Sequence, residues 1–185
     1  MKAIKFGVAS VLAAVTAILL ATGPLATAFS AHAQDSLADA RTATARYHDV
    51  GMAQANGYGL FPDATGIACI ANSGVGAMGV HYVNLALVGA GNIEARSPQA
   101  VVYEPMENGQ LRLVAVEYIA FQQAWDATHN APPTLFGQHF MLTPDGNRFG
   151  IPAFYSLHVW IWKDNPSGMF SMWNPRVHCD TSTTA

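Results

Sequence analysis

Apolar and polar positions alternate with the two-residue period of a β-strand in several segments of the chain. We expect strands at about residues 79–84, 100–104, 111–121 and 155–163, with weaker candidates at 85–89 and 139–142. A further short strand near residues 67–71 carries Cys69. Asn108-Gly109 predicts a hairpin, and the turn residues at 164–168 end the last strand.

The period changes to that of a helix before the first strand. From Leu37 to Gln54 the apolar residues step by threes and fours, which predicts one amphipathic helix that Ser36 caps and Gly57 ends. Its narrow, alanine-rich stripe suits close packing on a sheet. We therefore predict an α+β fold with an N-terminal helix on a curved antiparallel sheet. A small cupin-like or lipocalin-like barrel is the alternative.

Glycines crowd the segment before the second predicted strand. Residues 74–79 spell G-x-G-x-x-G, the pattern of a dinucleotide-binding loop. That loop requires a helix after it, whereas β-branched and aromatic residues follow here at 80–83. We interpret the glycines as a close backbone approach to a strand, and we expect no nucleotide cofactor.

The first 33 residues have the pattern of a secretory signal peptide. Lys2 and Lys5 precede an apolar run at 6–20, and the small residues Ala31 and Ala33 fit a cleavage site after Ala33. Cleavage after Ala28 is the alternative. The apolar run is short for a membrane span, so we expect a single secreted or periplasmic domain at 34–185 with no membrane attachment after cleavage.

Charge excludes one class of partner. The chain has 9 basic and 12 acidic side chains, and the leader removes two lysines, so the mature chain carries a net charge near −5. Its basic residues are not clustered, which argues against nucleic-acid binding. In an oxidising compartment Cys69 and Cys179 are expected to form a disulfide that ties the chain's end to the start of the sheet.

Strand alternation directs three ionisable side chains toward the interior. His81 shares its face with Val83, and Glu117 lies on the apolar face of 111–119. His158 shares its predicted face with two tryptophans. Buried polar groups need partners, so these three residues form either a hydrogen-bond network without metal or a metal site. A further hypothesis is that Glu104 and Glu117 are the acid and base of a glycoside hydrolase.

A set of two histidines and one carboxylate is typical of transition-metal sites with an open position. We therefore predict one zinc, iron, copper or nickel ion bound by His81, Glu117 and His158. His139 or Glu104 is the candidate fourth ligand. Such a protein becomes an enzyme if the open position activates water. The alternative is a non-catalytic small-ligand or structural module in which aromatic side chains line an apolar pocket, namely Tyr82, Tyr118, Trp160 and Trp162.

Several segments also resemble a family of small exported bacterial proteins. They include Gly79-Val80-His81-Tyr82-Val83-Asn84, Val116-Glu117-Tyr118, Leu157-His158-Val159-Trp160-Ile161-Trp162 and Asn174-Pro175-Arg176-Val177. The resemblance covers most of the chain after the leader and implies one intact secreted domain. The family is uncharacterised, so the resemblance implies no activity, cofactor or partner.

Overall fold

The computed structural model describes residues 37–179, and most of its strands belong to one antiparallel sheet. The strand order is β1-β3-β4-β5-β9-β8, and β2 also pairs with β3. The strands are β1 (Gly59–Leu60), β2 (Cys69–Asn72), β3 (Gly76–Val83), β4 (Ala100–Pro105), β5 (Leu111–Phe121), β8 (Met141–Thr143) and β9 (Phe154–Val159). A separate small hairpin pairs β6 (Thr134–Leu135) with β7 (Gln138–His139).

The expected α+β class with an antiparallel sheet is confirmed, and the barrel alternative is corrected. Among residues 37–179 the edge strands β1 and β8 are not paired with each other, so the sheet stays open. The long segment between β5 and β9 contains α4 (Gln122–Asp126) and three short strands, of which β8 overlaps the weak strand predicted at 139–142.

The N-terminal helical region is interrupted, although one continuous helix was predicted. Residues 37–44 are helical, η1 (Ala45–His48) follows, and α2 (Val50–Ala55) begins after Asp49. The Asp49 side chain caps α2 by accepting a hydrogen bond from the Gly51 N–H at 2.8 Å. Gly57, with φ of 88°, ends the region in the left-handed conformation as predicted.

The weak strand predicted at 85–89 is wrong, because these residues form α3 (Leu85–Ala90). The Asn84 side chain accepts hydrogen bonds from the N–H groups of Ala86 and Leu87, and Gly91 with φ of 69° supplies the C-terminal cap. These two caps outweigh the weak β preference of a short apolar run.

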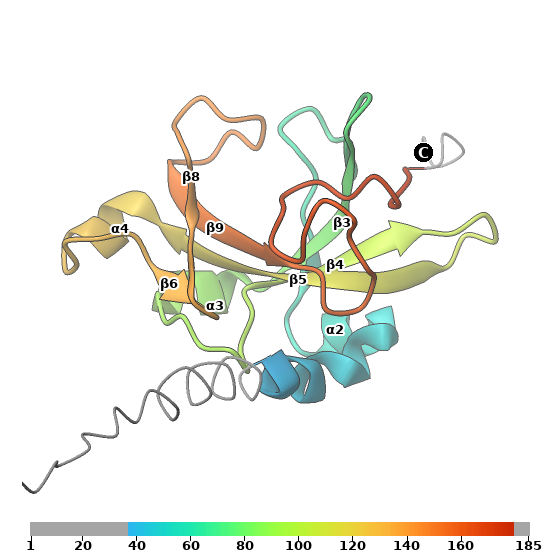
Figure 1. Cartoon of the computed structure of the whole chain (residues 1–185), viewed down its shortest axis with the longest axis horizontal. Coiled ribbons are helices and arrows are strands. Elements are labelled where there is room, and N and C mark those ends of the chain that lie inside the picture. The colour runs from blue at the N-terminus through green and yellow to red at the C-terminus, as the bar shows by residue number, and fades with distance from the viewer. Residues whose placement is uncertain (1–36, 180–185) are drawn as a thin grey trace, which may run out of the picture.

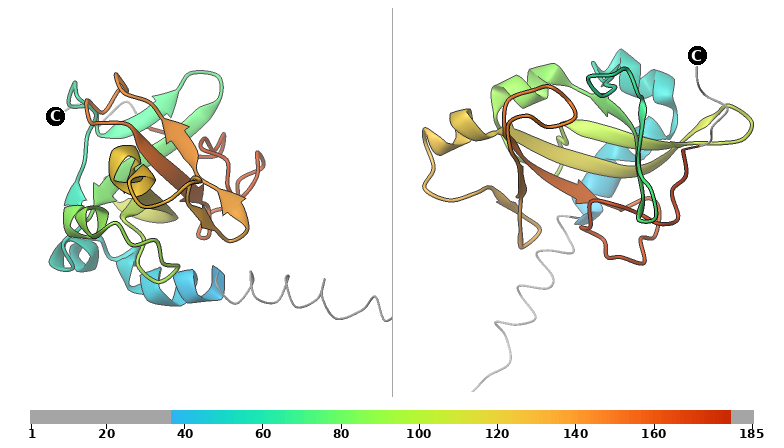
Figure 2. Two further views of the ribbon diagram at one scale, coloured as in Figure 1. Left: turned by 90° about the vertical axis from the view of Figure 1, so that its left-hand side faces the viewer. Right: turned by 90° about the horizontal axis from the view of Figure 1, so that it is seen from above.

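The two faces of the sheet have different covers. The helical region, blue and cyan in Figure 1, lies against one face, and the orange loop after β8 projects from the opposite side. The left-hand view in Figure 2 keeps this separation. On the helix side Tyr103 is fully buried, and its hydroxyl donates to the Tyr47 carbonyl at 2.7 Å. This face holds the larger hydrophobic core.

The C-terminal segment returns to the sheet and is fixed there. Ala77 and Asn174 form an antiparallel bridge, and a Cβ atom at Gly76 would lie 2.4 Å from the Asn174 carbonyl oxygen. The predicted close backbone approach is therefore real, with the chain end as the partner. The predicted Cys69–Cys179 disulfide is present and spans 110 residues. The chain-entropy model assigns such a loop about 4–5 kcal/mol.

The expected signal peptide at 1–33 lies outside the described residues. Within residues 37–179 no helix combines the length and the apolar character that a membrane crossing needs.

Candidate metal centre

The register of the strands places His81, Glu117 and His158 on one face of the sheet. Glu117 of β5 lies directly opposite His158 of β9. His81 of β3 pairs with Val102 of β4, and Val102 pairs with Ala115, two residues before Glu117. Positions two apart on a strand share a face, so all three side chains leave the sheet on the same side. This is the side opposite the N-terminal helices.

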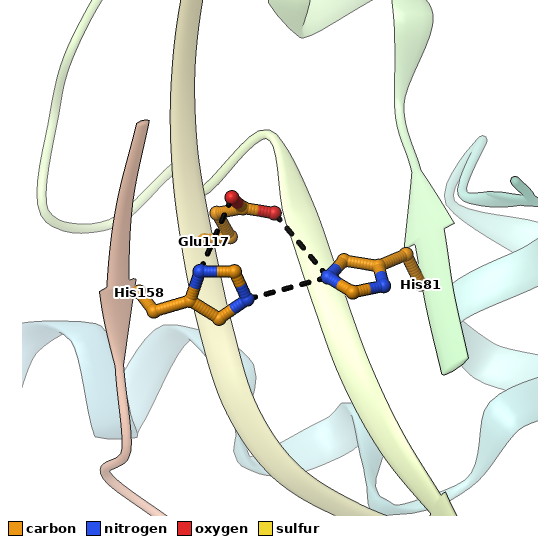
Figure 3. Close-up of side chains that lie close together, drawn as sticks. All are labelled: His81, Glu117 and His158. Atoms are coloured by element: carbon orange, nitrogen blue, oxygen red, sulfur yellow. Dashed lines mark hydrogen bonds and ion pairs between the residues drawn. The ribbon is translucent and has the colours of Figure 1, made fainter. Parts of the chain in front are cut away.

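Strand β4 lies between His81 and the other two residues. On the shared face, the position of β4 that pairs with Glu117 is Ala100, which is completely buried. A methyl group there leaves room above the sheet, and His81 reaches across it. Figure 3 shows the two imidazole rings and the carboxylate pointing toward one another from three strands.

The nitrogen and oxygen atoms of the three side chains are in contact distance. Nε2 of His81 lies 3.3 Å from Nε2 of His158 and 3.5 Å from Oε2 of Glu117. Nδ1 of His158 lies 3.2 Å from Oε1 of Glu117. One ligand atom from each residue can be chosen so that all lie within 4.8 Å of one another. The convergence expected from strand alternation is therefore present.

Burial sets the protonation state of the group. All three residues are at most 5% exposed. Burial lowers the pKa of His81 to about 4, although the negative charge of Glu117 acts in the opposite direction. Burial also lowers the pKa of His158 to about 4. For Glu117 burial raises the pKa, while the electrostatic interaction with His81 and a hydrogen bond from Ser156 oppose the rise. Both histidines are therefore neutral at pH 7, as metal ligands must be.

The protons of the group can be arranged in more than one way. Nε2 of His81 and Nε2 of His158 lie 3.3 Å apart, so one ring donates its N–H to the other when no ion is present. Nδ1 of His158 faces Oε1 of Glu117 at 3.2 Å, and because burial raises the pKa of Glu117, the proton of this contact can lie on either residue. With both Nε2 atoms unprotonated, two nitrogen lone pairs face each other, an arrangement that a shared cation stabilises.

The separations fit a first-row metal ion. With bonds of about 2.1 Å, neighbouring ligands of a tetrahedral ion lie roughly 3.4 Å apart. The distances of 3.3 Å and 3.5 Å from Nε2 of His81 are of this size. The donor types and these two separations therefore suit a zinc-like ion.

Neither candidate fourth ligand joins the group. Glu104 is held by hydrogen bonds from Lys163 at 2.7 Å and from Arg112, at a different place on the sheet. His139 is exposed and lines a separate cavity of about 200 Å³ whose wall His158 also shares. Among the described residues the group thus consists of three side chains.

A larger cavity of about 370 Å³ adjoins the group. His81, Glu117 and Ser156 form part of its wall, and the rest is mainly apolar. The apolar wall includes Phe61, Val88, Ile119, Phe149, Phe154 and Trp173.

The four aromatic residues predicted to line a pocket lie elsewhere. Neither of these two cavities includes Tyr82, Tyr118, Trp160 or Trp162 in its wall. Tyr82 and Tyr118 neighbour His81 and Glu117 in sequence, so alternation puts them on the helix face. Trp160 stacks beside His158 with 6.1 Å between ring centroids and bonds to the Ser171 carbonyl.

The prediction placed Trp162 on the wrong face because the last strand ends earlier than expected. The prediction extended this strand to residue 163, but β9 ends at Val159. The N–H of Ile161 then bonds to the Val159 carbonyl, and the chain turns. The Trp162 indole reaches the helix side, where its Nε1–H donates to the Thr44 hydroxyl at 3.2 Å.

Sequence reasoning missed three residues that shape the site. Ser156 precedes His158 by two positions, so the same alternation identifies it. Ala100 carries no polar signal, and only the register shows why its size matters. Phe149, whose ring centroid lies 6.4 Å from that of His81, belongs to a loop without periodicity.

Comparison with known proteins gives no relative for this site. No family model matches the chain, and neither a curated protein nor a solved structure matches it. The resemblance to exported bacterial proteins stays a prediction, and the function has to be inferred from the site itself.

Proposed function

We propose that this protein binds one transition-metal ion through His81, Glu117 and His158. The observation that carries the proposal is the environment of Glu117. Its carboxylate is buried on the face that the three strands share, where two neutral imidazoles and the Ser156 hydroxyl contact it and no cationic side chain does among the described residues. A buried carboxylate needs a positive charge nearby, and a divalent ion supplies it.

The donor types narrow the choice of ion. Two imidazoles and one carboxylate suit zinc, iron, copper or nickel, and are a poor match for calcium, which prefers oxygen ligands. Three protein ligands leave at least one position on such an ion for water or a small molecule. An ion bound there would lower the pKa of that water or polarise an oxygen of the bound molecule. Catalysis by the metal is therefore part of the proposal.

Two features support a location outside the cytoplasm. The Cys69–Cys179 disulfide suits an oxidising compartment, and the first 33 residues have the pattern of a signal peptide. We infer that the protein binds its metal in a secreted or periplasmic setting.

The cavity favours a second candidate function. About 370 Å³ of mainly apolar space lies within the range of small-molecule sites. In that case the protein is a non-catalytic ligand-binding module, and the two histidines and Glu117 only satisfy one another.

Elemental analysis distinguishes the two candidates. The protein, purified from its native compartment without an affinity tag, should contain nearly one equivalent of zinc, iron, copper or nickel. We expect Glu117→Gln, which keeps the side chain's shape, to lower zinc affinity at least about 100-fold, because an amide is a much weaker ligand than a carboxylate. His81→Ala with His158→Ala should remove the metal.

A matched control is the double variant His129→Ala, His139→Ala, which removes two exposed histidines outside the group. It should retain the metal. Circular dichroism checks that each variant is folded. A folded wild-type protein that contains no metal and takes none up when offered zinc would rule out the proposed site.

A further inference from the structure

The 370 Å³ cavity opens to solvent, and its volume lies in the range of small-molecule sites. For comparison, about 150 Å³ is enough to hold benzene. Most of the wall is apolar, so the transfer of apolar surface from water into it is favourable. The space therefore has the size and the surface of a binding site for an apolar molecule.

The polar groups of the wall are not spread evenly. On the sheet the polar side chains of the wall are His81, Glu117 and Ser156, which sit together, and Thr143 on the edge strand β8. On the loop that precedes β9, the Asn147 amide bonds to the carbonyls of Pro144 and Ile151. The guanidinium of Arg148 is paired with Asp63 at 2.8 Å, and its side chain is 37% exposed. The Asn147 amide is thus occupied by the protein, and the sheet residues are the polar partners that lie next to the metal ligands.

Aromatic rings surround the remaining space. Phe149 lies 6.3 Å from Phe61 and 6.1 Å from Phe154 between ring centroids, the second contact being edge to face. Such rings favour a further ring placed at an offset or edge-on angle. Their number on one wall points to a ligand with an aromatic ring.

We propose that the cavity is the substrate or ligand pocket of the metal site and takes a single aromatic ring carrying one oxygen donor, which binds the ion. This inference rests on the proposed metal site, since the ion supplies the partner for the oxygen. The apolar ring packs against the wall that Phe61, Phe149 and Phe154 form, and the oxygen lies at the side of His81 and Glu117.

Three probes that share the methylphenyl group test the proposal: toluene, p-cresol and 4-methylbenzoate, titrated by calorimetry into zinc-loaded and metal-free protein. With zinc, both oxygen-bearing probes should bind at least about tenfold more tightly than toluene. Without zinc, the affinity for 4-methylbenzoate should fall at least about tenfold, because its carboxylate then meets Glu117 without an intervening cation. Toluene affinity should stay within about twofold between the two forms, because the ring contacts do not involve the ion.

A variant of α3 locates the binding. Val88 is buried in the cavity wall, whereas Ala86 on the same helix is exposed. Val88→Trp should fill the cavity and lower the affinity for all three probes at least about tenfold. Ala86→Trp should change these affinities by less than about twofold. Both variants should keep one equivalent of zinc. If Val88→Trp does not fold, Val88→Phe is the smaller replacement.

Zinc stoichiometry is measured first, so that the two proposals fail separately. A protein that takes up no zinc overturns the proposed function and this inference with it. A protein that binds zinc, yet prefers toluene to both oxygen-bearing probes or binds them equally well in Val88→Trp, overturns the inference alone.

Discussion

Glu104 and Glu117 are buried carboxylates on neighbouring strands of one sheet, and their surroundings have opposite effects. Burial raises the pKa of Glu104, but hydrogen bonds from Lys163 and Arg112 and their charges outweigh it, so the pKa falls below its usual value. Burial raises the pKa of Glu117, and there it dominates. Glu104 has its cations within the chain. Glu117 has two neutral histidines, and this difference makes it the better candidate for binding an external cation.

Exchange of each carboxylate for an amide tests the comparison most strongly. In metal-free protein, Glu104→Gln should lower the free energy of unfolding by about 3 kcal/mol, because it leaves Lys163 without its charge partner. Glu117→Gln should change it by less than about 1 kcal/mol, because the carboxylate it removes has no cationic partner. Urea unfolding measures both. Equal decreases in the free energy of unfolding would show that the two carboxylates do not differ in their need for a cationic partner.

The pH dependence of stability gives the next largest effect. Both histidine pKa values lie near 4 in the folded protein, below the ordinary 6.5, so the unfolded chain binds protons first. The stability that the two neutral histidines contribute is fully present above pH 6.5. As pH falls toward 4, the free energy of unfolding decreases by about 1.4 kcal/mol per pH unit for each histidine. The raised pKa of Glu117 has the opposite sign and offsets part of the loss where that carboxyl takes up its proton.

Urea unfolding of metal-free protein at several pH values between 7 and 4 measures this slope. In the double variant His81→Gln, His158→Gln the slope should flatten. The zinc-loaded protein should release its ion over the same range. An unchanged slope in the double variant would mean that other groups cause the acid sensitivity.

The smallest effect concerns the more exposed partner of Glu104. The Arg112 side chain is 50% exposed, against 19% for Lys163. Solvent screens a half-exposed pair, so Arg112→Gln should cost less than about 1 kcal/mol in the urea experiment. Zinc affinity should not change. A loss as large as that of Glu104→Gln would show that the two cations do not contribute separately.

Strand alternation in the sequence predicted the central part of the site. His81, Glu117 and His158 each lie on an apolar strand face, and the three strands belong to one sheet. Alternation gives the face of a residue without the order of the strands. It therefore did not show that Ala100 of β4 lies beside Glu117, or that Glu104 already has Lys163 and Arg112 as partners.

The errors arose where the chain leaves regular structure. Two side-chain and glycine caps make α3 a helix, and an early turn after Val159 sends Trp162 to the other face. Much of the cavity wall, including Phe61 and Phe149, comes from loops. Loop residues follow no period, so their positions depend on tertiary contacts that a sequence pattern does not encode.

The spread of the three ligands along the chain has a consequence for the order of assembly. His81 and Glu117 lie on β3 and β5, but His158 belongs to β9, the last strand of the sheet, and the disulfide needs Cys179. A chain still emerging from the ribosome or a translocation channel has at most two of the three side chains until its final quarter is free. The complete ligand set therefore forms late, and the compartment in which folding finishes determines which ions the site meets.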